Sequence, residues 1–539
     1  MATNTAALKT FAQETRKKLM SLISTKMEFI LTQDTAELRG FESQIAKLKS
    51  AIASKGKELV EEEVAYTWFN RVMALRYMDA NGYTDLKVVT PGMGQMRPEI
   101  LQEAMAGNID EDLRVKVDDN PKEAVLYRRL LVAVCNQYGT SMPFLFEHIC
   151  DYTEMLLPDD LLSDQSFVTD IRNGMTDEDC QNVEVMGWLY QFYITDRKAD
   201  AETKKSKKGG LKSDEQAAAT QLFTPHWVVR YMVENSLGRI WMTLHPESRL
   251  IDEMPYYIPT PEGQADTIPE DIHSVQDICF IDPCMGSGHI LVYAFDLFSK
   301  MYEEEGYQSR EIPALILQNN IFGLDIDRRC YQLASFALTM KGRAYYSRYL
   351  RKVVEPNIIA LQPIDHDTID ASGAWGQKSL MWQFENIDTI GSLLKVTPEE
   401  CAAIHVDSGL FGVNQQILKT QAEYLSRKYH CVVTNPPYLG KGFCDALKNY
   451  VDNEYPSSKA DTMTVFMERC LELCKTKGKM SMINLPSWMF LGAFEKLRDR
   501  LIEHTHIDSL LHMGRGIFGI DWGSTAFVIS NTTNKTLGS

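Results

Sequence analysis

The second half of the chain contains short apolar runs that are separated by longer segments of helical character. These runs have the length of strands and end in turns; they are Ile278–Ile281, Asn320–Leu324, Cys431–Val433, Met480–Ile483 and Thr525–Ile529. Strands that alternate with helices are joined by crossover connections, and such connections make neighbouring strands parallel. The pattern therefore predicts an α/β domain built around a mostly parallel sheet.

The first two hundred residues differ, because helical patterns dominate there. Residues 64–83, VAYTWFNRVMALRYMDANGY, are dense in aromatic side chains and methionine and end in Asn-Gly, a good helix stop. A stripe of this kind usually packs inside a protein, so we expect a buried core helix. The preceding Glu61, Glu62 and Glu63 are expected to form a solvated helix face. No acidic cluster of nuclease type accompanies them, and we therefore expect no cleavage of nucleic acid.

A change of composition divides the chain. Residues 197–212, RKADAETKKSKKGGLK, are charged, rich in lysine and contain glycine. Such a stretch is typical of an exposed linker or loop. We therefore predict a helical domain over 1–196, a linker over 197–215 and an α/β domain over 216–535.

Charge and composition exclude several classes of protein. The formal net charge is −17, which argues against a surface coated with phosphate-binding groups, so any contact with nucleic acid is expected to be local. No apolar run is long enough to span a membrane, and the N-terminus lacks the pattern of a signal peptide. We expect a cytoplasmic protein without a membrane contact. Cys470 and Cys474 lack the second pair that a zinc site needs, so no metal is expected.

Two strand ends carry residues that suit a nucleoside-containing ligand. Residues 280–291, FIDPCMGSGHIL, predict a strand ending at Asp282, a glycine-rich turn, and a helix from about His289. The next strand, IFGLDID, ends in Asp325, which can accept hydrogen bonds from ribose hydroxyls. Asp327 is the expected cap of the following helix. Together the two strand ends predict an adenosine-containing cofactor.

A third strand ends in an unusual loop, CVVTNPPYLGKG, residues 431–442. One interpretation is a plain strand terminator made of two prolines. The other is a site for a planar amino group, with the Asn435 side-chain oxygen and the Pro436 carbonyl as hydrogen-bond acceptors. The combination DPxxGSG, GLDID and NPPY resembles the S-adenosylmethionine-dependent methyltransferases that act on N6 of adenine in DNA. That resemblance implies a Rossmann-like domain with a mostly parallel seven-stranded sheet, S-adenosylmethionine as cofactor, no metal, and double-stranded DNA with a flipped adenine as substrate.

The resemblance also implies roles for individual residues. Phe518 is the expected second aromatic beside the target base, with a core aromatic as the equal alternative. Asp388 is expected to accept from the amino group of the cofactor's adenine. The implied catalytic residues are Asn435, Pro436, Pro437 and Tyr438, and the implied cofactor-binding residues are Phe223, Thr224, Pro225, Asp282, Pro283, Cys284, Gly286, Ser287, Gly288, Asp325, Ile326 and Asp388.

A resemblance over the whole chain is more specific. The segments AYTWFNRVMALRYMDANGY, GWLYQFYITD, QLFTPHWVVRYMVENSLGRIW and NPPYLGKG are similar to the PglX-type methyltransferases of BREX phage-defence systems. This implies other BREX components as partners, and a phage-encoded DNA mimic as a candidate inhibitor. Members of that family continue into a target-recognition region, which we expect to be absent from a chain ending at Ser539. Two alternatives stay open: a cofactor-binding scaffold or sensor subunit of a defence complex, and a protein-glutamine N-methyltransferase.

Overall fold

The computed structural model describes most of the chain, and it divides into two compact units. Unit 1 comprises Met1–Thr195 with Leu350–Val353, and unit 2 comprises Asp196–Tyr349 with Val354–Ser539. The described residues are 5–36, 38–109, 113, 115, 122–147, 151–194, 224–261, 266–373, 375–409, 411–440, 442–517 and 523–532. The predicted linker 197–215, Phe223 and Phe518 lie outside them. Among the described residues, no helix has both the length and the apolar character to cross a membrane.

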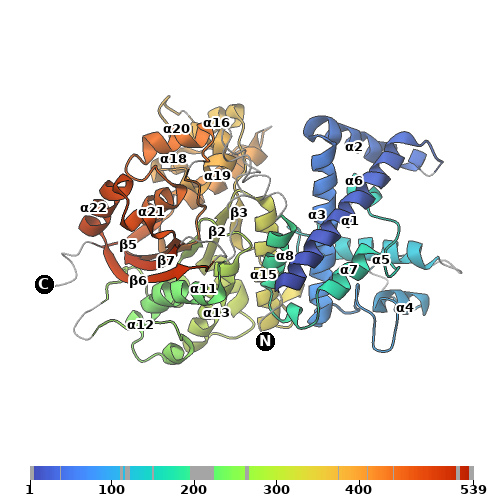
Figure 1. The fold of residues 1–539 in the computed structure, drawn as a ribbon, viewed down its shortest axis with the longest axis horizontal. Helices are drawn as coiled ribbons and strands as arrows, with labels where there is room; N and C mark the ends of the chain where they lie inside the picture. The colour runs from blue at the N-terminus through green and yellow to red at the C-terminus, as the bar shows by residue number, and fades with distance from the viewer. Residues whose placement is uncertain are drawn as a thin grey trace. The chain divides into compact units, whose positions relative to one another are not determined.

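Unit 1 is helical over its described residues. Its α-helices are α1 (Thr5–Thr32), α2 (Glu42–Lys55), α3 (Lys57–Ala80), α4 (Glu99–Met105), α5 (Glu123–Tyr138), α6 (Tyr152–Met155), α7 (Phe167–Gly174) and α8 (Val185–Tyr193). Helix α1 packs against α3, α7 and α8 (Figure 1). It does so with one buried stripe, whose members recur every three or four residues and are Leu8, Ala12, Thr15, Leu19, Ile23 and Met27.

Helix α3 is the core helix of unit 1, as predicted. Its side chains from Val64 to Met78 are nearly all buried, and it ends at Ala80 before Asn81 and Gly82. The prediction of a solvated acidic face before it was wrong, because Glu61 and Glu62 are each only 7% exposed. Lysine and arginine side chains lie beside these carboxylates: Lys57 Nζ is 3.7 Å from Glu61, and Arg16 from α1 is 3.4 Å from Glu62. The packing of α1 therefore buries acids that the local sequence predicted to be exposed.

Unit 2 contains the predicted sheet, in the order β3-β2-β1-β4-β5-β7-β6. The strands are β1 (Phe280–Asp282), β2 (Ile321–Asp325), β3 (Asn357–Ala360), β4 (Tyr429–Thr434), β5 (Cys474–Asn484), β6 (His506–Arg515) and β7 (Gly523–Ser530). Strands β1 to β5 pair in parallel, and β7 is antiparallel to both β5 and β6. The fold class is thus confirmed as α/β with a mostly parallel seven-stranded sheet.

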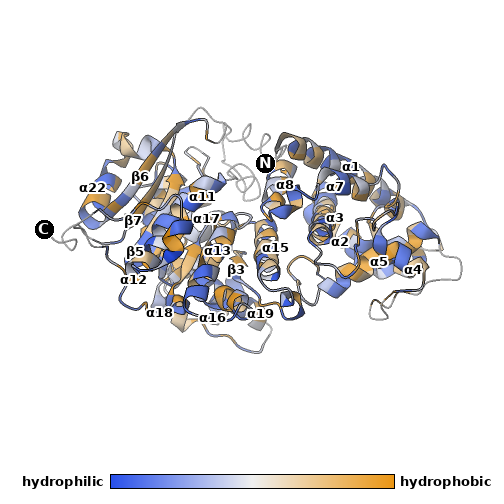
Figure 2. Cartoon of the chain, turned by 90° about the horizontal axis from the view of Figure 1, so that it is seen from below, coloured by the Kyte–Doolittle hydropathy of each residue, from blue (hydrophilic) through white to orange (hydrophobic). Residues whose placement is uncertain are grey.

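Helices cover both faces of this sheet (Figures 1 and 2). Alternate strand residues, such as Ile281, Val432, Met480 and Phe527, face a core shared with helices α16 to α22, and the strand residues between them are buried as well. Burial on both faces is typical of parallel sheets. The helices of unit 2 are α11 (His226–Val233), α12 (Arg239–Leu244), α13 (His289–Glu304), α14 (Ile312–Leu315), α15 (Arg328–Tyr345), α16 (His366–Ser372), α17 (Ile387–Ile390), α18 (Pro398–Ala403), α19 (Gly412–Ser426), α20 (Asp445–Glu454), α21 (Thr462–Leu473) and α22 (Glu495–His504).

Candidate functional site

The candidate residues follow three neighbouring parallel strands. Asp282 ends β1, Asp325 ends β2, and Asn435 comes directly after β4. Since β1 pairs in parallel with both β2 and β4, the carboxyl ends of all three strands lie at one edge of the sheet. Ligands of open α/β sheets bind at this edge. The topology therefore brings the glycine-rich turn, Asp325 and the Asn-Pro-Pro-Tyr loop together.

A buried hydrogen bond joins the β1 turn to the β4 loop. Asp282, which is 1% exposed, accepts from Thr434 Oγ1 at 2.7 Å and from the Cys284 amide at 3.0 Å. Burial raises the pKa of Asp282 to about 7, despite these two bonds. Thr434 immediately precedes Asn435, so this bond fixes where the loop leaves the sheet. Sequence reasoning missed Thr434, which was hidden among the apolar residues of its strand.

The turn needs glycine at two positions, for two different structural reasons. Gly286 has a φ of 53°, and a Cβ added there would meet no atom within 4 Å, so open space lies beside it. Gly288 has a φ of 83° and precedes α13; a Cβ there would come within 2.9 Å of Ala334 Cβ. The first glycine thus allows a ligand to approach the backbone, and the second allows α13 to pack against α15.

Asp325, at the carboxyl end of β2, also holds the glycine-rich turn in place. Its carboxylate accepts from the Gly286 amide at 2.9 Å and from the Asp327 amide at 2.8 Å. Burial is the largest cause that raises the pKa of Asp325 to about 7, and the charge of Asp327 adds to it. Asp327 caps α15 by accepting from the Arg329 amide, as predicted. Asp325 is therefore not used as the helix cap.

A short segment after β3 closes over the same strand ends. Asp388 lies in α17, just before Gly391, where an added Cβ would come within 3.1 Å of Ile326 Cγ2. The next residue, Ser392, donates to the Pro283 carbonyl at 2.6 Å. The contacts of Gly391 and Ser392 bring this segment against both the β1 turn and the end of β2, where the sequence predicted Asp388 to act. No sequence motif pointed to Ser392.

The Asn435 side chain lies between two hydroxyl groups. Its Nδ2 donates to Thr224 Oγ1 at 3.0 Å, and its Oδ1 accepts from the Tyr438 hydroxyl at 2.7 Å. Tyr438 also lies 2.9 Å from the Ile483 carbonyl at the end of β5. Burial raises the pKa of Tyr438, so its hydroxyl keeps the proton that it donates. Thr224 and Tyr438 thus hold the orientation of the carboxamide.

The rest of the loop is fixed by the start of α21. Thr462 Oγ1 donates to the Pro437 carbonyl at 2.5 Å and accepts from the Leu439 amide at 2.9 Å. Asp461 caps α21 by accepting from the Met463 amide. The two prolines also restrict φ near −65°. The loop is therefore held rigidly on both sides of Tyr438.

These residues fit an adenosine-containing cofactor. Two carboxylates lie at adjacent strand ends, Gly286 leaves open space beside its backbone, and Ile326 offers an apolar surface at the end of β2. Phe223 and Phe518, also predicted for the site, lie outside the described residues. The site residues that the structure describes come from the carboxyl edge of the sheet, from Thr224 and Pro225 just before α11, and from Asp388 in α17.

Comparisons with known proteins show what this chain is similar to. Residues 319–518 match the Eco57I restriction-modification methylase family. The chain is 37% identical to the adenine-specific methyltransferase BrxX of Escherichia coli O9:H4 (strain HS), across 90% of this chain and 45% of BrxX. It is 33% identical to the adenine-specific methyltransferase PglX of Lacticaseibacillus casei (strain Zhang), across 97% of this chain and 50% of PglX. The chain thus spans about half the length of these curated relatives.

Solved structures add a distant likeness of fold. A complex of DrdV with DNA aligns with 99% of this chain and 42% of the DrdV chain, at 11% identity and a TM-score of 0.46. The chain is therefore similar to the PglX-type adenine-specific methyltransferases over about half of their length, and the resemblance predicted from its motifs is confirmed.

Proposed function

We propose that the chain transfers a methyl group from S-adenosylmethionine to N6 of an adenine in DNA. The observation that carries this proposal is the bond from Thr434 to Asp282, which sets Asn435 beside the glycine-rich turn. A donor held at the turn and an acceptor held at the loop would then be neighbours. Holding two reactants in this way supplies a large part of a rate enhancement.

The loop residues address the weak nucleophilicity of the adenine amino group. Its nitrogen lone pair is delocalised into the ring, and two acceptors aimed at the N–H bonds favour a tetrahedral nitrogen instead. We assign these acceptors to Asn435 Oδ1 and the Pro436 carbonyl. Asn435 Oδ1 already accepts from the Tyr438 hydroxyl, so an entering adenine would exchange one donor for another. The Tyr438 ring is assigned to stack on the base, which has to leave the duplex to reach it.

The cofactor side is assigned to the residues at the ends of β1 and β2. S-adenosylmethionine, when bound, supplies a methyl group on a sulfonium, which needs no acid or base to activate it. Asp325 would accept from the ribose hydroxyls, Asp388 from the adenine amino group, and the turn from Asp282 to Gly288 would enclose the amino-acid and sugar parts. None of these roles needs a metal ion.

We further propose that the activity serves a BREX-type phage-defence system. The supporting observation is the similarity to BrxX and PglX over nine-tenths or more of this chain. Other BREX components and double-stranded DNA are the proposed partners, with a phage-encoded DNA mimic as a candidate inhibitor.

The proposed function is tested by incubating the chain with S-adenosylmethionine labelled in the methyl group and with phage or host DNA. The DNA is then digested to nucleosides, and the label is expected in N6-methyladenine. Synthetic duplexes without adenine should remain unlabelled. Binding of the cofactor with no label in DNA would overturn the activity, and label in protein glutamine would identify another acceptor.

Thr224 offers a test of how the Asn435 carboxamide is held. Thr224→Val removes the acceptor for Asn435 Nδ2 at nearly constant volume, and we expect kcat for methylation to fall about tenfold, as for one lost hydrogen bond of about 1.4 kcal/mol. Thr224→Ser keeps the hydroxyl and should retain most of the activity. The kinetics of both variants and their Kd values for S-adenosylmethionine separate this role from the cofactor-binding role that the resemblance implies for Thr224. A weaker Kd with unchanged kcat would contradict the expectation.

A further inference from the structure

A loop beside the candidate site holds two large apolar side chains in solvent. The loop follows β5 and contains two 3₁₀ turns, Pro486–Met489 and Gly492–Phe494. Between them, Phe490 is 71% exposed and Leu491 is 54% exposed, whereas Trp488 and Phe494 on either side are each 4% exposed. Exposed apolar groups of this size mark contact surfaces when they gather at one place.

The backbone of this loop is fixed, so the exposure of Phe490 is built into the fold. Arg498 of α22 donates to the Trp488 carbonyl at 2.8 Å and to the Leu491 carbonyl at 2.7 Å. The Phe490 and Leu491 amides both donate to the Ser487 carbonyl, at 3.2 and 3.0 Å. These hydrogen bonds therefore fix the backbone on both sides of Phe490, and the Phe490 side chain remains in solvent.

A second set of contacts ties the loop to the sheet. The Trp488 indole donates to Asn484 Oδ1 at 3.0 Å, and its ring packs against Phe527 of β7 with centroids 5.5 Å apart. Thr525 of β7 donates to the same Asn484 oxygen at 2.7 Å. The buried indole thus anchors the loop at the point where β5 and β7 pair. The exposed Phe490 stands two residues beyond this anchor.

The loop stands at the same sheet edge as the Asn-Pro-Pro-Tyr loop. β4 and β5 are parallel neighbours, and the Tyr438 hydroxyl is 2.9 Å from the carbonyl of Ile483, three residues before the first turn. The end of β6 is also close, because a Cβ at Gly523 would lie 3.3 Å from Pro486 and 3.6 Å from His512 Nε2. Arg515, paired with Gly523, adds a permanent positive charge there. A chain of net charge −17 thus has a cationic side chain at this edge, where a phosphate backbone would pass.

We propose that Phe490, with Leu491 beside it, inserts into the base stack of DNA next to the target adenine. The inference rests on the proposed function, since it needs an adenine that leaves the duplex. Apolar wedges stabilise opened base steps, and unstacking and unpairing carry a cost that an inserted ring offsets. The Phe490 ring is large enough to stack on a base, and it is exposed enough to reach DNA. Because the backbone of the loop is already fixed, insertion would cost little conformational entropy.

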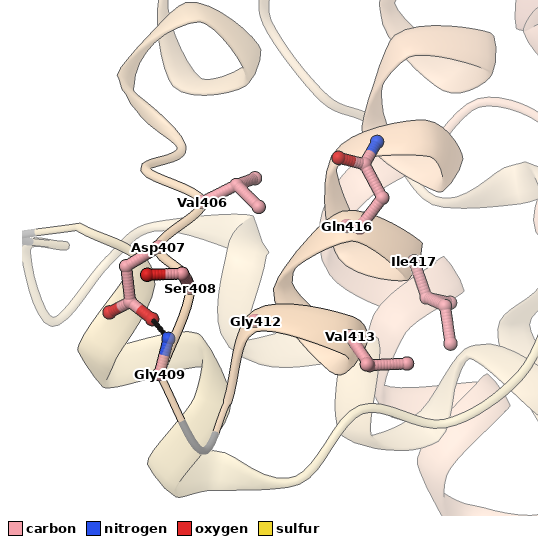
Figure 3. Close-up of a pocket in the computed structure, with 8 residues that line it drawn as sticks. All are labelled: Val406, Asp407, Ser408, Gly409, Gly412, Val413, Gln416 and Ile417. Carbon is pink, nitrogen blue, oxygen red and sulfur yellow. Dashed lines mark hydrogen bonds between the residues drawn. The ribbon is translucent and has the colours of Figure 1, made fainter.

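A matched control lies on another part of unit 2. Val413, 76% exposed, belongs to a surface depression lined also by Val406, Asp407, Gln416 and Ile417 (Figure 3). Val413 lies in the first turn of α19, which packs against α16 and α18. Nothing in the described residues indicates an occupant for this depression. Val413→Ala therefore removes an exposed apolar side chain without touching the β5 loop.

The test compares two duplexes that share one site methylated by the unsubstituted chain. In one the target adenine faces thymine; in the other it faces an abasic position, so that no base pair has to open. We expect Phe490→Ala to methylate the paired duplex about tenfold more slowly and the abasic duplex within about twofold of the unsubstituted chain. Phe490→Leu should lose less on the paired duplex, and Val413→Ala should match the unsubstituted chain on both.

Two results would overturn the inference alone. One is an unchanged rate of Phe490→Ala on both duplexes; the other is an equal loss on both, which would indicate a contact with protein or a folding role instead. Thermal unfolding and the Kd for S-adenosylmethionine are measured for each variant, and both should be unchanged. If the unsubstituted chain methylates no DNA at all, the proposed function fails and the inference fails with it.

Discussion

Asn435→Ala is expected to lower the rate of methyl transfer to adenine by about a thousandfold, the loss typical of a removed hydrogen-bonding group that stabilises a transition state. The substitution removes the Oδ1 acceptor assigned to the adenine amino group, and it also removes the Nδ2 donor to Thr224. The Kd for S-adenosylmethionine should stay within about twofold, since Asn435 has no assigned contact with the cofactor. Single-turnover methylation and calorimetric titration measure the two quantities separately.

Asn435→Asp sharpens this test. The carboxylate keeps an acceptor toward the amino group, and the Thr224 hydroxyl can donate to it, so a part of the activity should survive. Asn414→Ala, on the solvent side of α19, serves as a control for a lost asparagine and should leave the rate unchanged. A normal methylation rate for Asn435→Ala would show that the loop does not hold the acceptor base.

The five apolar runs predicted the centre of the sheet but not its two edges. All five lie within or next to observed strands, whereas β3 and β6 were not predicted. Both are edge strands, and β6, with the sequence HIDSLLHMGR, has no residue classed as buried. A strand with one open side needs no continuous apolar run. The five strands found from the sequence are the ones that the sheet encloses.

The candidate site was predictable where one short motif supplies the chemistry. Three features can be recognised from a few residues at the end of a predicted strand: the glycine-rich turn, Asp325 and the Asn-Pro-Pro-Tyr loop. The contacts that join them were not predictable, because they link residues far apart in the sequence. Thr224 bonds Asn435 across 211 positions, and Thr434 bonds Asp282 across 152. The parallel pairing of β1 with β4 brings Thr434 to Asp282, and the start of α11 brings Thr224 to Asn435.

Asp325→Asn is expected to weaken S-adenosylmethionine binding about a hundredfold at pH 8, because two ribose hydroxyls lose a charged acceptor worth ~2–3 kcal/mol in all. The amide keeps one oxygen for the Gly286 or Asp327 amide, so the turn should survive. Asp327→Asn is the matched control, since asparagine also caps helices well and this residue has no assigned contact with the ribose. Equal affinities of the Asp325→Asn variant and the unsubstituted chain would contradict the ribose assignment.

The pKa of Asp325 makes the same contact depend on pH, with opposite signs for binding and stability. Burial raises the pKa values of Asp325 and Asp282 to about 7 in the folded chain, above the unfolded value of 3.8. The folded chain therefore binds more protons than the unfolded chain between these values, and this contribution to the free energy of unfolding is lost as pH rises through about 7.

Ribose hydroxyls need the carboxylate, so cofactor affinity should instead rise about tenfold from pH 6 to pH 8. The increase in Tm caused by S-adenosylmethionine should therefore grow from pH 6 to pH 8. Over the same pH range, the two carboxyl groups stabilise the cofactor-free chain less. Asp325→Asn should remove most of this pH dependence of the increase in Tm. The negative charge of Asp325 helps to raise the pKa of Asp282, so the pH dependence that remains should shift to lower pH.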